Sequence, residues 1–213
     1  MPLLEINGLI WEAHGVRRRL SPDPLTLGEN KVAVVVARDF AVGEAFTDVL
    51  LGLAQPVAGQ ILLDGKDITG MPTAEREIGL VPAGGGLLPH LTVRRNLELA
   101  AHASNGFAPV SPGYIGHVTK RLHIEGRMGD KPHELGHEER LTVALARVLC
   151  RPVTTKAVVV EDRKGWESCD GAVKRAMDED HKLTVLIVTD DNTTVANYAS
   201  SSDLLEITDV DKS

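Results

Sequence analysis

The segment whose residues are most suited to ligand binding or catalysis follows a run of aliphatic residues at 32–36. Residues 37–47 read Ala-Arg-Asp-Phe-Ala-Val-Gly-Glu-Ala-Phe-Thr, and residues 48–53 continue with helical spacing. A buried strand, a tight connection and a helix are the layout of a phosphate-binding loop. Such a loop needs several glycines, a lysine for the outer phosphates and a hydroxyl for magnesium. Here Gly43 is the one glycine, no lysine is present, and Asp39 and Glu44 are acids, so the layout lacks its usual chemistry.

A second candidate is the acid pair Glu161–Asp162, which follows a predicted buried strand at 157–160. Residue types alone favour a solvated strand end for this pair. His133 and His137 are four residues apart without a third ligand, so we interpret them as surface residues and predict no metal site. Two cysteines without metal or redox spacing are interpreted as reduced thiols, with a single disulfide as the alternative.

Composition excludes several classes of function. The chain of 213 residues carries a net charge of −7 and only 3% aromatic residues, which argues against a nucleic-acid partner. No basic, apolar leader is recognisable at the N-terminus, and no apolar run approaches the ~20 residues that a membrane span requires. We therefore expect a cytoplasmic protein without a direct membrane span.

The hydrophobic pattern predicts an α/β core that positions these residues. An edge-type strand is predicted at 4–9, a hairpin turn at 28–30 and a central strand at 31–36. Further strands are predicted at 25–27, 60–63, 78–81, 157–160, 184–188 and 204–207. Helices are predicted at 43–53, from 92 onward, and around 118–122, 139–150 and 170–177. Residues 105–113 are interpreted as a linker or exposed loop, and residues 208–213 as a frayed tail.

Four segments resemble, in order, motifs of the ATP-binding subunit of ABC transporters, particularly of the bacterial import type. Residues 60–70 (Gln-Ile-Leu-Leu-Asp-Gly-Lys-Asp-Ile-Thr-Gly) resemble the hairpin after the Walker A helix. Residues 76–81 and 88–97 resemble the Q-loop segment, and 132–135 with 143–147 bracket the signature motif. Residues 184–191 resemble the H-loop strand. The resemblance implies a RecA-like P-loop NTPase core with an antiparallel β edge, formed by 1–87 and 151–213, and an inserted helical subdomain at 88–150.

The resemblance fails at the residues that handle nucleotide. The Walker A lysine falls at Gly43, and the hydroxyl residue that binds magnesium falls at Glu44. The Q-loop glutamine is replaced by Ala83 and the H-loop histidine by Asp190. The degenerate phosphate-loop positions are Ala37, Arg38, Asp39, Gly43, Glu44 and Ala45. The signature positions are Leu135, Gly136, His137, Glu138 and Glu139, of which the last two are expected to present negative charge to a phosphate.

Walker B is nearly retained, with its two acids swapped as Glu161–Asp162, whereas residues 164–168 lack the expected D-loop aspartate. Trp11 lies near the place of the family's adenine-stacking aromatic residue and is interpreted as a packing residue.

These departures imply an ABC-family pseudo-ATPase, a non-catalytic partner or regulatory subunit of a membrane transport complex. No cofactor is expected, beyond weak Mg-ATP at most. The implied partners are a membrane permease, a second and competent ABC ATPase subunit, or both, with a homodimer as an alternative. The implied location is the cytoplasm, peripherally at the inner face of the cell membrane. Two alternatives are an ATP-hydrolysing subunit with atypical motifs and a binding module with a repurposed cleft.

Overall fold

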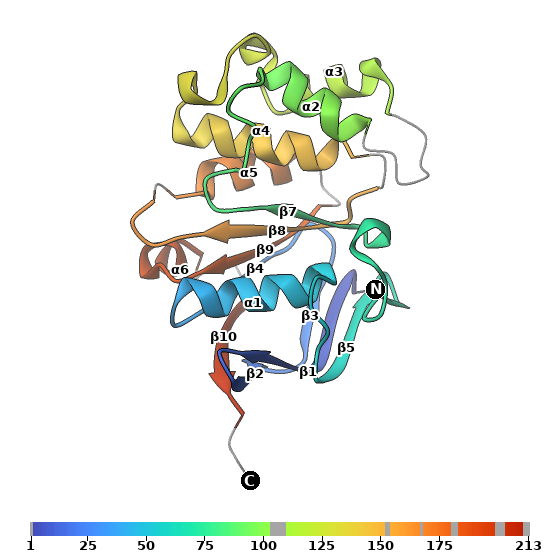
Figure 1. Cartoon of the computed structure of the whole chain (residues 1–213), viewed down its shortest axis with the longest axis vertical. Helices are drawn as coiled ribbons and strands as arrows, with labels where there is room; N and C mark the ends of the chain where they lie inside the picture. The colour runs from blue at the N-terminus through green and yellow to red at the C-terminus, as the bar shows by residue number, and fades with distance from the viewer. Residues whose placement is uncertain are drawn as a thin grey trace.

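The structure is a computed structural model that describes residues 2–102, 110–151, 154–166, 168–179, 183–198 and 203–210. Within these residues, one ten-stranded sheet has the strand order β6-β5-β1-β2-β10-β4-β9-β8-β7, and β3 pairs with β1. Figure 1 shows the parallel strands at mid-height, helices α2, α3 and α4 above them, and the antiparallel strands below.

The strands are β1 (Leu4–Ala13), β2 (Val16–Ser21), β3 (Leu25–Leu27), β4 (Val32–Val36), β5 (Ala58–Leu63), β6 (Lys66–Asp67), β7 (Ile78–Val81), β8 (Ala157–Asp162), β9 (Thr184–Thr189) and β10 (Asp203–Asp209). The α-helices are α1 (Phe40–Leu51), α2 (Val93–Ala101), α3 (Pro112–Arg121), α4 (His137–Leu149), α5 (Asp170–Glu179) and α6 (Asn192–Tyr198). Short 3₁₀ turns are η1 (Thr73–Glu75), η2 (Glu125–Arg127) and η3 (Pro132–Glu134).

Strand β10 joins two kinds of sheet. It pairs in parallel with β4, which continues in parallel through β9 and β8 to β7, and it pairs antiparallel with β2. Strands β4, β8 and β9 are buried along nearly their whole length and consist mainly of aliphatic residues, as expected for strands covered on both faces. The predicted central strands at 31–36, 157–160 and 184–188 are therefore confirmed.

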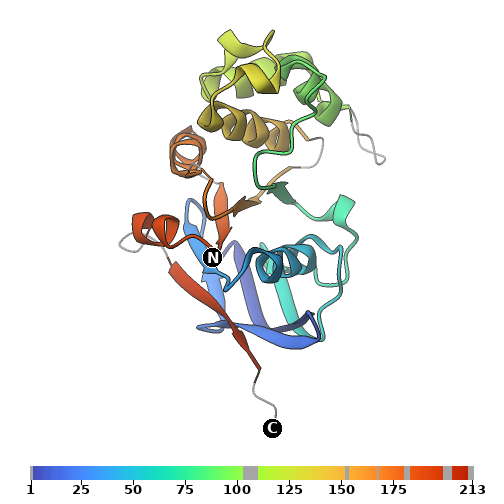
Figure 2. The same ribbon diagram turned by 60° about the vertical axis from the view of Figure 1, so that its left-hand side comes forward.

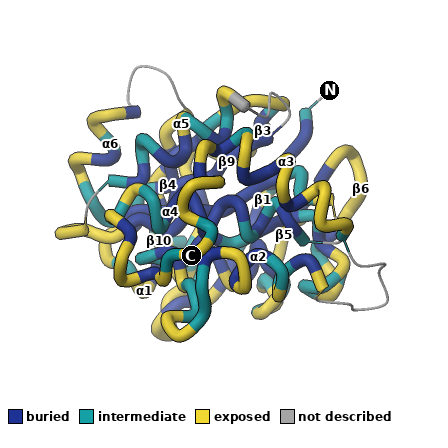
Figure 3. Tube along the Cα trace, turned by 90° about the horizontal axis from the view of Figure 1, so that it is seen from above, coloured by how far each residue is buried: buried dark blue, intermediate teal, exposed yellow. Residues whose placement is uncertain are grey.

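Alternate residues of the parallel strands face two separate hydrophobic cores. Val35, Leu186 and Val159 pack with α1 and the antiparallel strands. Val34 and Ile187 pack with residues of helices α2 to α5 on the opposite face. Figure 2 shows α1 between the two groups of strands, and Figure 3 shows the buried strands at the centre of the molecule with exposed loops around them.

Helix α1 is fixed at its C-terminal end by a buried arginine. Gly52 ends the helix with a left-handed φ of 76°. The Arg76 side chain is fully buried and donates hydrogen bonds to the carbonyl oxygens of Val49 and Leu50, at 2.9 and 2.6 Å. It also donates to the carbonyls of Thr69 and Met71, so one side chain joins α1 to the β6–η1 connection.

Three predictions in the antiparallel region are corrected. Strand β1 is not an edge strand, because it pairs with β2 on one side and β5 on the other; its alternating pattern reflects two different faces of the sheet. Residues 28–30 do not close a hairpin, because β3 pairs with β1 whereas β4 pairs in parallel with β9 and β10. The tail does not fray at 208, because β10 continues to Asp209 beside β2 and Asp209 forms an ion pair with Arg18; residues 211–213 lie outside the described residues.

Helix boundaries also differ from the predictions. Helix α1 begins at Phe40 rather than at residue 43, because Asp39 caps it, and it ends at Leu51. Helix α3 begins at Pro112 within the predicted linker, because the Ser111 hydroxyl accepts a hydrogen bond from the Tyr114 N–H. The rest of that linker, up to residue 109, lies outside the described residues.

Candidate functional site

The phosphate-loop positions form a short connection between β4 and α1. The Ala37 N–H donates to the Thr189 carbonyl of β9 at 2.8 Å, which fixes the start of the connection. Asp39 then has an extended backbone, and its Oδ1 accepts a hydrogen bond from the Val42 N–H at 3.0 Å. A backbone donor of the first helical turn is therefore already used by the protein's own carboxylate.

Gly43, at the position of the family's lysine, lies in the first turn of α1 and is buried. A Cβ atom added to Gly43 would lie 2.9 Å from Val188 Cγ1 and 3.4 Å from the Ala37 Cβ. Any side chain at residue 43 would therefore have to displace Val188 of β9. Glu44 and Arg38 are exposed, and Ala45 is partly buried.

The side chain of Arg163, the residue that follows β8, lies next to this connection. The guanidinium carbon of Arg163 lies 5.0 Å from the centroid of the Phe40 ring, within the range of a cation–π contact. The Phe40 ring therefore occupies space at the beginning of α1. The sequence analysis did not identify this contact, because its two residues are far apart along the chain.

Glu161 and Asp162 are the last two residues of β8, and their exposed fractions are only 8% and 5%. The interpretation as a solvated strand end is therefore wrong: both residues continue the pairing of β8 with β9, and their side chains are buried, Asp162 against Thr194 of α6. Burial raises the pKa of both carboxyl groups. The charges of Glu44 and Asp48 also raise the pKa of Glu161, which brings this acid into the electrostatic surroundings of α1.

The Asp162 carboxylate is turned toward β9 and α6. Its Oδ2 accepts hydrogen bonds from the hydroxyl groups of Thr189, at 3.1 Å, and Thr194. The Thr189 hydroxyl in turn accepts from the Asp191 N–H at 2.9 Å. A carboxylate at the position of a general base is thus used to join three elements of the fold.

Asp190, at the H-loop position, also has a structural contact. Its Oδ1 accepts a hydrogen bond from the Lys164 N–H at 2.7 Å, which joins the end of β9 to the loop that follows β8. Ala83, at the Q-loop position, provides no side-chain polar group, but its N–H interacts with Glu161 and partly opposes the rise in the pKa of that residue. Glu167 of the predicted D-loop segment lies outside the described residues.

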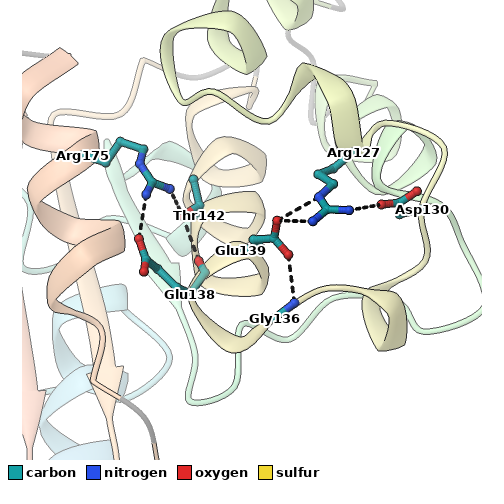
Figure 4. Close-up of polar contacts among 7 residues, drawn as sticks. All are labelled: Arg127, Asp130, Gly136, Glu138, Glu139, Thr142 and Arg175. Atoms are coloured by element: carbon teal, nitrogen blue, oxygen red, sulfur yellow. Dashed lines mark hydrogen bonds and ion pairs between the residues drawn. The ribbon is translucent and has the colours of Figure 1, made fainter.

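The signature positions begin helix α4 (Figure 4). Leu135 is buried, and the Gly136 N–H donates to Glu139 Oε2 at 2.9 Å. The other Glu139 oxygen accepts from Arg127 Nε at 2.8 Å. Glu138 accepts from Arg175 of α5 at 2.7 Å, and Arg175 also donates to the Thr142 hydroxyl. Both glutamates are therefore paired with arginines. Their negative charge is compensated within the protein, whereas the sequence alone led us to expect that it would face a phosphate.

The remaining sequence-predicted residues have ordinary structural environments. Trp11 is fully buried, with its ring centroid 5.0 Å from that of Phe46, so its interpretation as a packing residue is confirmed. Cys150 and Cys169 are free, buried thiols, and burial raises the pKa of Cys150 to about 12. In the described part of the chain, no group of three or more His, Cys, Asp or Glu side chains is arranged to hold a metal ion, and no helix has the length and apolarity needed to cross a bilayer.

Sequence comparisons place the chain among transport proteins. The sequence profile of the family described as "ABC transporter" matches residues 45–155, just over half of the 213 residues. The thiamine import ATP-binding protein ThiQ of Escherichia coli K12 is 25% identical over 207 residues, covering 94% of this chain and 86% of ThiQ. The putrescine transport ATP-binding protein PotG of the same strain is 28% identical over 150 residues, covering 70% of this chain and 40% of PotG. Against ThiQ of Brucella abortus, the match spans about half of that relative, at 53%.

Solved structures confirm the predicted fold. The cbiO1 structure from Clostridium perfringens, part of the ABC transporter complex cbiONQ, superposes with a TM-score of 0.73 at 19% identity, covering 97% of this chain and 87% of cbiO1. The ADP conformation of MJ1267, an ATP-binding cassette of an ABC transporter, superposes with a TM-score of 0.72 at 16% identity, covering 93% of this chain and 85% of MJ1267. The fold is therefore that of an ABC ATPase cassette, with a RecA-like P-loop NTPase core. The chain belongs to the ABC transporter family.

Proposed function

We propose that this chain is an ABC transporter subunit that does not hydrolyse ATP and acts through contacts with other subunits. The main supporting observation is the first turn of α1. Gly43 stands in place of the lysine, its surroundings are filled by Val188, and the Asp39 carboxylate binds the Val42 N–H. The residues present do not fit Mg-ATP, because a triphosphate would meet Gly43 where the family provides a lysine and the acid Glu44 where it provides a hydroxyl.

Electrostatics indicates the size of this effect. One acid about 4 Å from a phosphate charge costs roughly 1 kcal/mol in water and about 4 kcal/mol at an effective dielectric constant of ~20. Loss of the lysine removes an attraction of similar size. Since ~1.4 kcal/mol changes affinity tenfold, these terms together weaken binding by on the order of a thousandfold. Arg38 and Arg163 offset only part of this loss, because Arg38 precedes the helix and Arg163 stacks on Phe40.

Hydrolysis also needs a group that positions water and cations that clamp the transferred phosphate. Asp162 is held by Thr189 and Thr194, and Asp190 by the Lys164 backbone, so neither acid is oriented by groups that would serve hydrolysis. Ala83 has no polar side chain. We therefore propose that the purified protein releases no phosphate from ATP.

The functions of the named relatives support a role in transport. ThiQ and PotG are ATP-binding proteins of thiamine import and putrescine transport. By analogy, we propose that this chain binds a membrane permease, a competent ABC ATPase subunit, or both, at the cytoplasmic face of the membrane. We also propose that residues 1–87 with 151–213 form the core and that 88–150 form the helical subdomain, which together with the loop at 82–91 is the permease-facing surface.

The primary test is isothermal titration of the full chain with Mg-ATP, together with a phosphate-release assay. ThiQ of E. coli, purified in the same way, is the positive control. We expect no saturable binding in the micromolar range and no phosphate release above the buffer rate. Micromolar affinity, or phosphate release that disappears in Glu161→Gln or Asp162→Asn, would show that the chain is instead an ATPase with atypical motifs.

A second test addresses the partners. The tagged full chain is co-expressed with a candidate permease and its ATPase subunit, and the complex is purified in detergent. We expect the chain to co-purify in a fixed ratio with the permease, the ATPase subunit or both. If it purifies alone under conditions in which the permease and the ATPase still associate, its proposed role as a subunit is wrong.

A further inference from the structure

A groove of about 410 Å³ lies between helices α2 and α3, which are neighbours in the helical part of the molecule (Figure 1). The turn η2 and Met128, the residue after it, complete the lining. The volume falls within the range of about 300–1,000 Å³ that is usual for small-molecule sites. The lining includes none of the residues at the family's nucleotide-handling positions, so the groove is separate from them.

Backbone hydrogen bonds hold the walls of the groove in place. The Arg94 N–H, in the first turn of α2, donates to the Met128 carbonyl at 3.1 Å. At the end of α3, the Ile124 N–H donates to the Thr119 carbonyl at 3.0 Å, which turns the chain from α3 into η2. A wall that is ordered before binding reduces the entropy lost when a ligand binds.

The floor of the groove is apolar. Ile115 of α3 is buried, and Met128 packs against the same hydrophobic core. The one hydroxyl group beside them, that of Thr119, already donates to the Gly116 carbonyl at 3.0 Å. The floor therefore suits the apolar part of a ligand and makes no polar demand on it.

Gly116 leaves space in the wall that α3 contributes. Glycine is a poor helix former, yet neither packing nor a positive φ requires it here, because an added Cβ would meet no atom within 4 Å. Since Gly116 lines the groove, a long side chain at this position would occupy part of the groove. A glycine at residue 116 thus suits a groove that stays open for a ligand.

The rim of the groove carries charges of both signs. Arg94 of α2 and Lys120 of α3 are exposed cations, and Glu125 of η2 is an exposed acid. Among the described residues, none of these three forms an ion pair. The other acid of the rim, Glu98, pairs with Arg95 at 2.9 Å. The rim therefore offers two cations and one acid to a ligand.

We propose that this groove binds a free amino acid with an aliphatic side chain. Its carboxylate pairs with Arg94 and Lys120, and its ammonium group pairs with Glu125. Its side chain lies on Ile115 and Met128. A simple carboxylate would be repelled by the acid of the rim and a simple amine by the two cations, so a zwitterion is the ligand whose charges match.

The test is isothermal titration of the full chain with L-leucine and three analogues that each lack one feature. The compound 4-methylpentanoate lacks the ammonium group, 3-methylbutylamine lacks the carboxylate, and glycine lacks the aliphatic side chain. Thermal denaturation with the same ligands is a second readout, because a ligand that binds only the folded state raises the melting temperature. Neither nucleotide nor permease is present, so the result is independent of the tests of the proposed function.

We expect saturable binding of L-leucine with a dissociation constant below about 1 mM, and about tenfold weaker binding of each analogue. Lys120→Gln should lower the affinity for L-leucine about tenfold without lowering that for 3-methylbutylamine. Glu125→Gln should weaken L-leucine binding without weakening that of 4-methylpentanoate. Lys66→Gln, at an exposed lysine of β6, is the matched control and should bind L-leucine like the unmodified chain.

Gly116→Leu is expected to fill the groove and abolish binding of L-leucine. Circular dichroism establishes that each variant is folded, and Lys120→Gln and Glu125→Gln change only exposed residues, so they test the proposal even if Gly116→Leu does not fold. The proposal is overturned if L-leucine gives no saturable binding, if any of the three analogues binds as tightly as L-leucine, or if Lys120→Gln, Glu125→Gln or folded Gly116→Leu binds L-leucine like the unmodified chain.

Discussion

The Thr194 hydroxyl donates a hydrogen bond to the buried carboxylate of Asp162, which joins helix α6 to the end of strand β8. Thr189 donates to the same carboxylate oxygen. The acid that falls at a catalytic position of the family is therefore part of the internal structure of this chain. Its role in stability can be measured apart from any reaction.

Replacing Thr194 by valine keeps the shape of the side chain but removes the hydroxyl donor. The buried Asp162 then loses one of its two threonine donors, and we expect the free energy of unfolding to fall by about 1–3 kcal/mol. Urea denaturation measures this change. Thr193→Val is the comparison on the same helix: its exposed hydroxyl interacts with the Asp191 carboxylate near the surface, so its substitution should cost less stability than Thr194→Val. Equal effects of the two substitutions would contradict the assigned role.

The raised pKa of Glu161 leads us to expect that the stability of the protein depends on pH. Burial, together with the charges of Glu44 and Asp48, raises the pKa of Glu161 in the folded protein. Between the unfolded and folded pKa values, the folded state binds more protons, so the contribution of Glu161 to stability falls as pH rises through this window. Glu161→Gln is therefore expected to increase the free energy of unfolding at neutral pH, because it removes a buried carboxylate whose ionisation opposes folding there.

The measurement for Glu161 is urea denaturation at a series of pH values from about 4 to neutral. The unmodified protein should lose stability relative to Glu161→Gln as pH rises. Glu29→Gln, at an exposed turn residue, is the control and should follow the unmodified protein. A Glu161→Gln curve parallel to that of the unmodified protein would mean that this carboxyl group has no raised pKa.

The close packing around Gly43 leads us to expect that a side chain at this position would clash with Val188. Alanine is the better helix former by about 1 kcal/mol, but at this position its Cβ would lie 2.9 Å from Val188 Cγ1. We expect overpacking to dominate, so that Gly43→Ala lowers the free energy of unfolding by about 1–3 kcal/mol. Gly116→Ala in α3, where no atom lies within 4 Å of the added Cβ, should instead stabilise the protein.

The double variant Gly43→Ala/Val188→Ala separates the two contributions at Gly43. If the clash with Val188 is the cause, Gly43→Ala should be less destabilising in the Val188→Ala background than alone, as a double-mutant cycle would show. Additive effects would mean that Val188 does not limit the space at residue 43.

Arg76 is expected to be the most sensitive arginine for stability. Arg76→Met removes a buried cation that donates to four backbone carbonyls and leaves those acceptors without these donors. A loss of about 3 kcal/mol is expected from unsatisfied buried groups. Thermal and urea denaturation measure it, with exposed Arg94→Met as the control. If the two variants were equally stable, the hydrogen bonds of Arg76 would contribute little.

The sequence predicted the elements that can be recognised from the hydrophobic pattern of neighbouring residues. The aliphatic runs of β4, β8 and β9 identify central strands, because a strand covered on both faces has no polar side. The order of the family motifs predicted the fold, which solved structures confirm. The residue types at the nucleotide-handling positions, such as Gly43 and Asp190, were also evident from the sequence.

Only the tertiary structure decided which distant residues meet. Pairing with both β2 and β5 makes β1 an interior strand, and packing at the end of β8 buries Glu161 and Asp162. The packing of α5 beside α4 brings Arg175 to Glu138, and two loops bring Trp166 over Gly84. The physical reason is that hydrophobic periodicity depends only on residues that are neighbours in the sequence. The burial of a charged group, and the partners of its hydrogen bonds, depend instead on elements that are distant along the chain.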